Sequence, residues 1–159
     1  MKGGGQMKFT CEISPDAAYD EVIIRCRSRS DKIRLLESAI ENALAGDSEL
    51  VLFIRDSEYY VPKGDILFFE TDDGKVKAHT SDRIYTSEHK LFELEEMMPR
   101  YFVRVSKSCI VNVKKIESIT RNPLGASEVR LRGCEKKVYA SRSYYKILKD
   151  KINEVRLKK

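Results

Sequence analysis

The sequence predicts an α+β protein built mostly from antiparallel strands, and three observations support this fold class. From Glu49 onward, short apolar runs recur at close and regular intervals, which favours an antiparallel sandwich or a barrel-like sheet. Turn residues separate these runs, and Asp73-Gly74 is a strong hairpin signal. Apolar side chains repeat at helical spacing in a few segments between and after the strands. At 159 residues, the chain fits one domain, or one domain with a small appended module.

The N-terminal part of the sequence predicts a small ββα unit over residues 7–46. Two runs, Lys8–Ile13 and Glu21–Arg27, have the character of strands, and the second is apolar on both faces, as a covered strand would be. A helix is expected next, with Gly46 as its natural end. Residues 1–6, with the sequence MKGGGQ, indicate a tag remnant or a disordered start.

Residues 49–156 predict a second and larger unit. Its strands are expected at Leu50–Arg55, Glu58–Pro62, Ile66–Glu70, Val76–Thr80, Arg83–Thr86, Tyr101–Val105, Ile116–Arg121, Glu128–Arg132 and Lys136–Ala140. One helix is expected at Glu88–Met98, before Pro99, and another at Ser143–Arg156. The last helix carries an apolar stripe, so we expect it to pack on the sheets rather than to lie free in a DNA groove.

The charge of the chain is distributed unevenly. Residues 100–159 hold 17 Lys and Arg against 5 Asp and Glu, whereas residues 1–99 hold 13 against 20. The modest total of +5 therefore conceals a strongly basic C-terminal region beside an acidic N-terminal one. Such asymmetry indicates a polyanionic partner, most simply a nucleic acid, although a basic face can also serve only to keep a surface solvated.

The sequence lacks the constellations that are typical of enzymes and metal sites. It has no nucleophile elbow, no phosphate-cradling glycine loop and no H-E-x-x-H helix. Its four cysteines are far apart and form no C-x-x-C pair, and its two histidines add no spacing typical of zinc ligands. We therefore expect no catalytic activity, no metal and no cofactor, and we expect His79 to be a surface or packing residue.

The sequence gives no sign of a membrane or secreted protein. No apolar run approaches the roughly 20 residues that a spanning helix needs, and the start of the chain lacks the pattern of a signal peptide. We therefore expect a cytoplasmic protein without membrane insertion. In that compartment thiols stay reduced, and Cys109, inside an apolar run, is expected to fill the core.

Two segments of the C-terminal half combine small hydroxyl donors with basic side chains. Tyr101–Ile119 holds a Ser-Lys-Ser turn and then an apolar run that ends near Lys114. Tyr139–Lys149 adds a second hydroxyl cluster around Arg142. Short donors beside cations suit phosphate oxygens and base edges. Asn112 falls inside the apolar run, so we expect it to hydrogen-bond the backbone internally and not to contact DNA.

These motifs resemble the LytTR DNA-binding domain of bacterial transcription regulators. FVRVSKSCIVNVKKIESI followed by VYASRSYYKILK is similar to the family's R-x-S-x-S turn, its V-N pair and its later S-R-x-Y at the start of a helix. DILFFETDDGKVKAHT is similar to an earlier strand signature of the family. The resemblance covers about residues 49–150. It implies an elongated fold of three small β-sheets with short helices, which contacts successive major grooves through its loops and bends the duplex.

The resemblance also implies which residues bind DNA. Three loops carry the contacts in the family, and the basic run adds one lysine. The resulting candidates are Lys75, Arg104, Lys107, Ser108, Lys114, Ser141, Arg142, Ser143 and Lys146. Lys107 and Ser143 differ from the residues at these places in the best-known staphylococcal virulence regulator, so we expect a different base preference here.

The leading prediction is therefore a sequence-specific regulator that binds double-stranded DNA. Residues 7–46 are too few for the receiver domain that many members carry, so the protein resembles the stand-alone type, controlled by abundance, dimerisation or a sequestering protein partner. We expect a homodimer formed through this N-terminal unit. Two alternatives stay open: a protein-interaction module whose basic face binds an acidic partner or an anionic surface, and an RNA-binding protein that stacks bases on its tyrosines.

Overall fold

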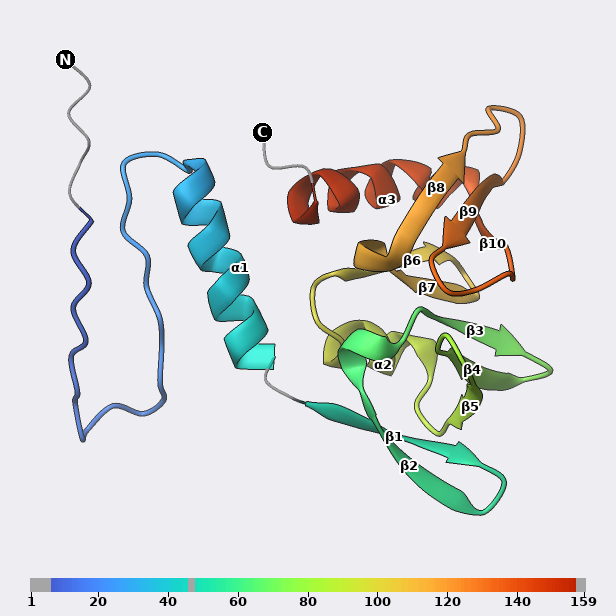
Figure 1. Cartoon of the computed structure of the whole chain (residues 1–159), viewed down its shortest axis with the longest axis horizontal. Coiled ribbons are helices and arrows are strands. Elements are labelled where there is room, and N and C mark those ends of the chain that lie inside the picture. Colours follow the sequence, from blue (N-terminus) through green and yellow to red (C-terminus); the bar gives the residue numbers. More distant parts are fainter. Residues whose placement is uncertain (1–6, 46–47, 157–159) are drawn as a thin grey trace.

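A computed structural model of the chain describes residues 7–45 and 48–156 (Figure 1). Its elements, in chain order, are α1 (Asp31–Ala45), β1 (Glu49–Ile54), β2 (Ser57–Pro62), the 3-10 helix η1 (Lys63–Asp65), β3 (Phe68–Asp72), β4 (Lys75–His79), β5 (Ile84–Ser87), α2 (Leu91–Met97), β6 (Phe102–Ser106), β7 (Cys109–Asn112), the 3-10 helix η2 (Val113–Lys115), β8 (Ile116–Thr120), β9 (Ser127–Leu131), β10 (Val138–Ala140) and α3 (Arg142–Val155). Within the described ranges, no helix combines the length and the apolar character that crossing a bilayer requires.

The strands form two antiparallel sheets. The larger has seven strands in the order β2-β1-β5-β4-β3-β7-β6, and the smaller has three in the order β10-β9-β8. The β1–β2 hairpin joins the larger sheet through a single pair, Phe53 with Thr86, so it forms an arm at one end of the molecule (Figure 1). The antiparallel α+β class is confirmed. The expected three sheets are two continuous ladders instead, because β3 pairs with β7 over Phe68–Glu70 and fuses two of the expected sheets.

Two apolar cores lie on the two faces of the larger sheet. Neighbouring residues of a strand point to opposite faces, and accordingly Phe68 belongs to one core and Phe69 to the other. The first core is closed by the smaller sheet and α3, and the second by α2. This arrangement explains why Ile66–Phe69 and Cys109–Val111 are continuous apolar runs, since both faces of the chain are covered there.

The three helices have different roles in packing. α3 buries Leu148 and Ile152 against the first core, as its apolar stripe predicted, although Ile147 from the same stripe is half exposed. α2 buries Leu91 and Leu94 against the second core. α1 lies at the side of the molecule away from the β3–β4 hairpin (Figure 1).

The two strands predicted before α1 are wrong, whereas α1 itself is confirmed. Residues 7–30 contain neither helix nor strand. A strand needs a partner that supplies hydrogen bonds and a surface that covers its apolar face, and an isolated hairpin is marginal in water. This segment has neither, and Phe9 and Ile13 are 90% and 87% exposed. Residues 1–6 and Gly46, for which a disordered start and a helix stop were predicted, lie outside the described residues.

Candidate nucleic-acid interface

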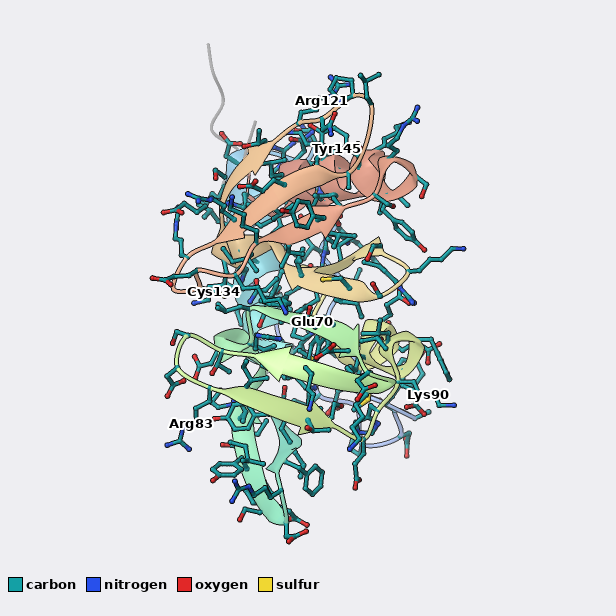
Figure 2. The ribbon with its side chains drawn as sticks, turned by 90° about the vertical axis from the view of Figure 1, so that its right-hand side faces the viewer. Glu70, Arg83, Lys90, Arg121, Cys134 and Tyr145 are labelled. Atoms are coloured by element: carbon teal, nitrogen blue, oxygen red, sulfur yellow. The ribbon has the colours of Figure 1, made fainter. Side chains whose placement is uncertain are left out.

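Three loops that carry most of the predicted contact residues lie on one side of the molecule. Loop 1 is the β3–β4 turn, Asp72–Lys75; loop 2 is the β6–β7 turn, Ser106–Ser108; loop 3 is the β10–α3 junction, Ser141–Ser143. All three lie toward the right in Figure 1, on the side that faces the viewer in Figure 2. Strands distant in sequence thus present three short polar segments together.

Backbone hydrogen bonds connect the three loops through the strands that carry them. The Thr71 amide donates to the Ser108 carbonyl at 2.9 Å and joins β3, next to loop 1, to loop 2. The Ser141 amide donates to the Val105 carbonyl at 2.8 Å and joins loop 3 to β6. Val105 is the extra residue of a β-bulge, because Arg104 pairs with Ile110 whereas Ser106 already pairs with Cys109. The bulge takes Val105 out of the ladder, and its carbonyl is used for loop 3 instead.

Loop 1 is a tight hairpin turn with a lysine at its exit. Asp73 and Gly74 both have positive φ, at 49° and 73°, which is the geometry of the turn that Asp-Gly favours. Lys75 is exposed at the first position of β4 and pairs across the hairpin with Asp72. Because two exposed carboxylates stand next to this lysine, loop 1 is the least basic of the three loops.

Loop 2 presents Lys107 and Ser108 to solvent, and both side chains are exposed. The Ser106 hydroxyl accepts from the Ser108 amide at 3.2 Å and shapes the turn. Arg104 lies behind the turn and bonds it: its Nε donates to the Ser106 carbonyl at 3.1 Å, and its Nη2 donates to the Lys107 carbonyl. Arg104 is therefore committed to the interior of the loop, while Lys107 and Ser108 form its outer edge.

Loop 3 places two hydroxyls and a guanidinium at the start of a helix. Ser141 is the N-cap of α3, and its hydroxyl lies 3.2 Å from that of Ser143. Arg142 and Ser143 are exposed in the first turn, and Lys146 is exposed one turn further. Unpaired backbone amides and the positive end of the helix dipole make a helix start favourable for anions. Loop 3 thus combines the partial positive charge of the helix start with the exposed cations Arg142 and Lys146.

Two predicted residues lie away from these loops. Lys114 follows β7 at the end opposite to loop 2, a strand of about 13 Å, and its Nζ lies 4.3 Å from the centre of the Tyr101 ring. Asn112 is 1% exposed; its Nδ2 donates to the Ile66 carbonyl at 3.0 Å and its Oδ1 accepts from the Lys114 amide at 3.0 Å. The internal backbone role expected of Asn112 is confirmed.

A charged cluster that the sequence did not reveal lies between the two sheets. His79, 4% exposed, stacks on Phe68 with ring centres 4.1 Å apart, and its Nε2 lies 2.8 Å from Glu70 Oε1. Lys136 of the β9–β10 loop pairs with the same oxygen, and Figure 2 shows Glu70 near the middle of the molecule. Burial lowers the pKa of His79 despite the nearby carboxylate. The expected packing role of His79 is confirmed; the hairpin register that pairs it with Phe68 was the available signal.

Glu95 of α2 is a second residue of this region that sequence patterns did not indicate. Its Oε2 accepts a hydrogen bond from Arg104 Nη1 at 2.8 Å. No sequence spacing signals this contact, since it depends on how α2 packs beside β6. Burial raises the pKa of the Cys109 thiol to about 12, in agreement with its expected place in the core. Among the described residues, no group of three or more His, Cys, Asp or Glu side chains could hold a metal ion.

The protein is an antiparallel α+β module with three polar loops on one side, and comparison with known proteins identifies its family. The family model of the LytTr DNA-binding domain matches residues 56–153. The chain belongs to the LytTR DNA-binding domain family.

Curated relatives and a solved structure extend this similarity. Uncharacterized HTH-type transcriptional regulators of Staphylococcus aureus strains NCTC 8325 / PS 47 and COL are each 28% identical over 147 residues, which is 92% of this chain and 99% of each relative. The LytTr DNA-binding domain of a putative methyl-accepting/DNA response regulator from Bacillus cereus has a TM-score of 0.62 and 25% identity, covering 67% of this chain and 98% of that chain. Although the relatives are named HTH-type, the described part of this chain has no two successive helices that could form such a motif, since strands separate all three α-helices.

Proposed function

We propose that this protein is a transcription regulator that binds double-stranded DNA in a sequence-specific manner through loops 1, 2 and 3. The observation that carries the proposal is that loops 1, 2 and 3 lie on one side of the molecule and that the Thr71–Ser108 and Ser141–Val105 hydrogen bonds link them through β3 and β6. Membership of a DNA-binding family and exposed cations in each loop support duplex DNA over an acidic protein partner, an anionic surface or RNA. The family binds DNA rather than catalysing a reaction, and we assign no catalytic role here.

The proposed contacts are divided between base reading and phosphate binding. Arg142 at the start of α3 is the candidate for reading a guanine edge, because a guanidinium can donate two parallel bonds there. Lys107 and Lys146 are candidates for phosphate contacts, which set orientation and affinity rather than sequence. The remaining contact residues are hydroxyls and one lysine: Ser108, Ser141, Ser143 and Lys75. Lys114 is left out of this contact set because it lies at the opposite end of β7.

The spacing of the loops supports a major-groove arrangement. The strand order β4-β3-β7-β6 separates the centres of loops 1 and 2 by two strand spacings, which is about 10 Å. This distance fits within the about 12 Å width of a major groove. Loop 3 lies beyond β6, farther from loop 1 than loop 2 is. A straight duplex would not contact all three loops at once, so we propose that the DNA bends toward the protein.

We propose further that the regulator acts as a homodimer in the bacterial cytoplasm, where it meets chromosomal DNA. The residues before α1 have the sequence of strands without a partner strand, and Val22 and Ile23 are each 61% exposed. A second copy would cover these side chains in a symmetric contact and would double the DNA contacts without new base reading. Light scattering tests the proposed dimer. The full chain should be a dimer, and a chain without residues 1–30 should be a monomer.

Selection of binding sites from a random duplex pool, followed by titration of the selected duplex, tests the function itself. Affinity should fall with salt at a slope equivalent to roughly 4–8 released counterions. Arg142→Ala should cost about 1–3 kcal/mol and relax the preference at one base position, whereas Lys146→Ala should weaken selected and random duplexes alike.

Arg83→Ala is the matched control, because Arg83 lies in the β4–β5 turn at the other end of the strands from loop 1, and it should bind like the wild type. Failure to enrich any sequence, or binding that does not respond to salt, would overturn the proposed function.

A further inference from the structure

Arg104 makes three polar contacts in the free protein, and all three are to groups of the protein itself. Its Nε and Nη2 donate to the carbonyls of Ser106 and Lys107, and its Nη1 donates to Glu95 Oε2. The Arg104 side chain is 22% exposed, in contrast with the exposed Lys107 beside it. Three of the five N–H donors of the guanidinium are therefore used inside the protein.

The β-bulge lies directly beside loop 2. The pairing of β6 with β7 shifts between Arg104 and Ser106, and Ser106, paired with Cys109, leads straight into the turn. A planar guanidinium presents several donors in a fixed fork and can bind two neighbouring carbonyls at once. Arg104 thereby holds the backbone of Ser106 and Lys107, directly before Ser108 at the outer edge of loop 2.

Glu95 completes this arrangement from another element. Its carboxylate comes from α2, whose Leu91 and Leu94 are anchored in the second core, so it holds Arg104 from a rigid support. A lysine could not replace Arg104 in this network, because an ammonium cannot span the two carbonyls and the carboxylate in one plane. The order of support runs from the core through α2 and Glu95 to Arg104, and from there to the loop.

We infer that Arg104 is a positioning residue that sets loop 2 for DNA through Glu95, and that it is not itself a DNA contact. This inference rests on the proposed function and adds Glu95 as a determinant of binding. It makes an unusual prediction, because Glu95 is an acidic residue near a polyanion. Removing its negative charge weakens binding if it supports Arg104, but strengthens binding if it merely competes with DNA for Arg104.

Glu95→Gln is therefore the decisive variant, and Glu96→Gln is its control, since it removes the same charge from the next residue of the same helix. Affinity is measured for a duplex obtained by site selection and for a random duplex of equal length. Glu95→Gln should weaken binding to the selected duplex by three- to tenfold and to the random duplex by less than twofold. Glu96→Gln should leave both affinities unchanged or slightly tighter. Tighter binding by Glu95→Gln to the selected duplex would overturn the inference.

The salt dependence of Arg104→Gln gives a second and independent readout. A lost phosphate contact lowers the slope of log K against log salt by about 0.9, whereas a lost positioning residue leaves the slope unchanged. We expect an unchanged slope, a loss of selected-duplex affinity similar to that of Glu95→Gln, and a double variant no weaker than Arg104→Gln alone. A slope reduced by about one contact, or additive losses, would overturn the inference.

Thermal melting of each variant confirms that it is folded before binding is compared. Lys107→Gln and Arg142→Gln separate this inference from the proposed function. If these two variants bind the selected duplex as the wild type does, the proposed function fails; if they lose affinity while Glu95→Gln gains it, only the positioning role of Arg104 fails.

Discussion

Replacing Asn112 by alanine should destabilise the protein without removing a DNA contact. Asn112 joins two places in the fold: its Nδ2 bonds the Ile66 carbonyl before β3, and its Oδ1 caps the Lys114 amide at the start of η2. The side chain is buried, so water cannot easily replace either bond.

The magnitude follows from these two bonds. A buried carbonyl left without its donor costs about 1–3 kcal/mol, and a lost N-cap costs about 0.5–2 kcal/mol. Together they give a loss of about 1.5–5 kcal/mol in the free energy of unfolding for Asn112→Ala. For a chain of this length, each kcal/mol lowers the melting temperature by about 2–4 °C, so a decrease of about 3–20 °C is expected.

The assay is urea denaturation followed by circular dichroism, combined with DNA titration at a temperature where the variant remains folded. Asn153→Ala is the control, since Asn153 is exposed on α3 and its replacement should change stability by less than about 0.5 kcal/mol. Folded Asn112→Ala should bind the selected duplex within about threefold of the wild type, since its bonds are internal. A stability loss below about 0.5 kcal/mol, or lost DNA binding at unchanged stability, would refute this reasoning.

Three further results are expected from titratable groups. Because burial lowers the pKa of His79 in the folded protein, the unfolded chain binds that proton more tightly. The contribution of His79 to stability is complete above pH 6.5 and declines as pH falls below it. His79→Gln should therefore make the urea midpoint less dependent on pH between 5 and 8, and an unchanged pH dependence would contradict the lowered pKa of His79. With a pKa of about 12, the Cys109 thiol should react with an aromatic disulfide reagent at pH 8 after unfolding only, whereas exposed Cys11 and Cys26 react at once; rapid loss of all four thiols in the native protein would oppose this. Asp73→Asn keeps a residue type that tolerates positive φ and removes a negative charge from loop 1. If loop 1 contacts DNA as proposed, affinity should rise two- to threefold, equivalent to about 0.6 kcal/mol for a phosphate about 7 Å away, and weaker binding would mean that the carboxylate accepts a bond from a base.

Local features of the fold were predictable because each depends on residues close together in the chain. The Asp73-Gly74 turn requires positive φ at both residues, and the sequence specifies it directly. The helices α1, α2 and α3 appear where apolar residues repeat at helical spacing, with ends shifted by a few residues. The prediction of two N-terminal strands was wrong because a strand depends on a distant partner, and strand-like residues form no strand without one.

Loops 1, 2 and 3 were predictable as a set of motifs but not as a surface. Ser-Lys-Ser and Ser-Arg-Ser can be read from the sequence, and their resemblance to a family indicated that they bind DNA. Their arrangement depends on pairings between distant residues: β3 with β7, and Ser141 with the bulge at Val105. A bulge is a one-residue difference between two strands, and no pattern within either strand reveals it.

The sequence by itself determined the class of fold, the turn chemistry, the basic C-terminal region and the family. The tertiary structure decided which polar side chains face outward and which are used inside the protein. Arg104 and Lys107 are both basic and three residues apart, and composition does not distinguish them. Arg104 is held inward because the carbonyls of loop 2 and the Glu95 carboxylate of α2 accept its N–H groups, whereas Lys107 extends to solvent. Charge is a property of the residue, but its availability to DNA depends on the donors and acceptors that folding brings around it.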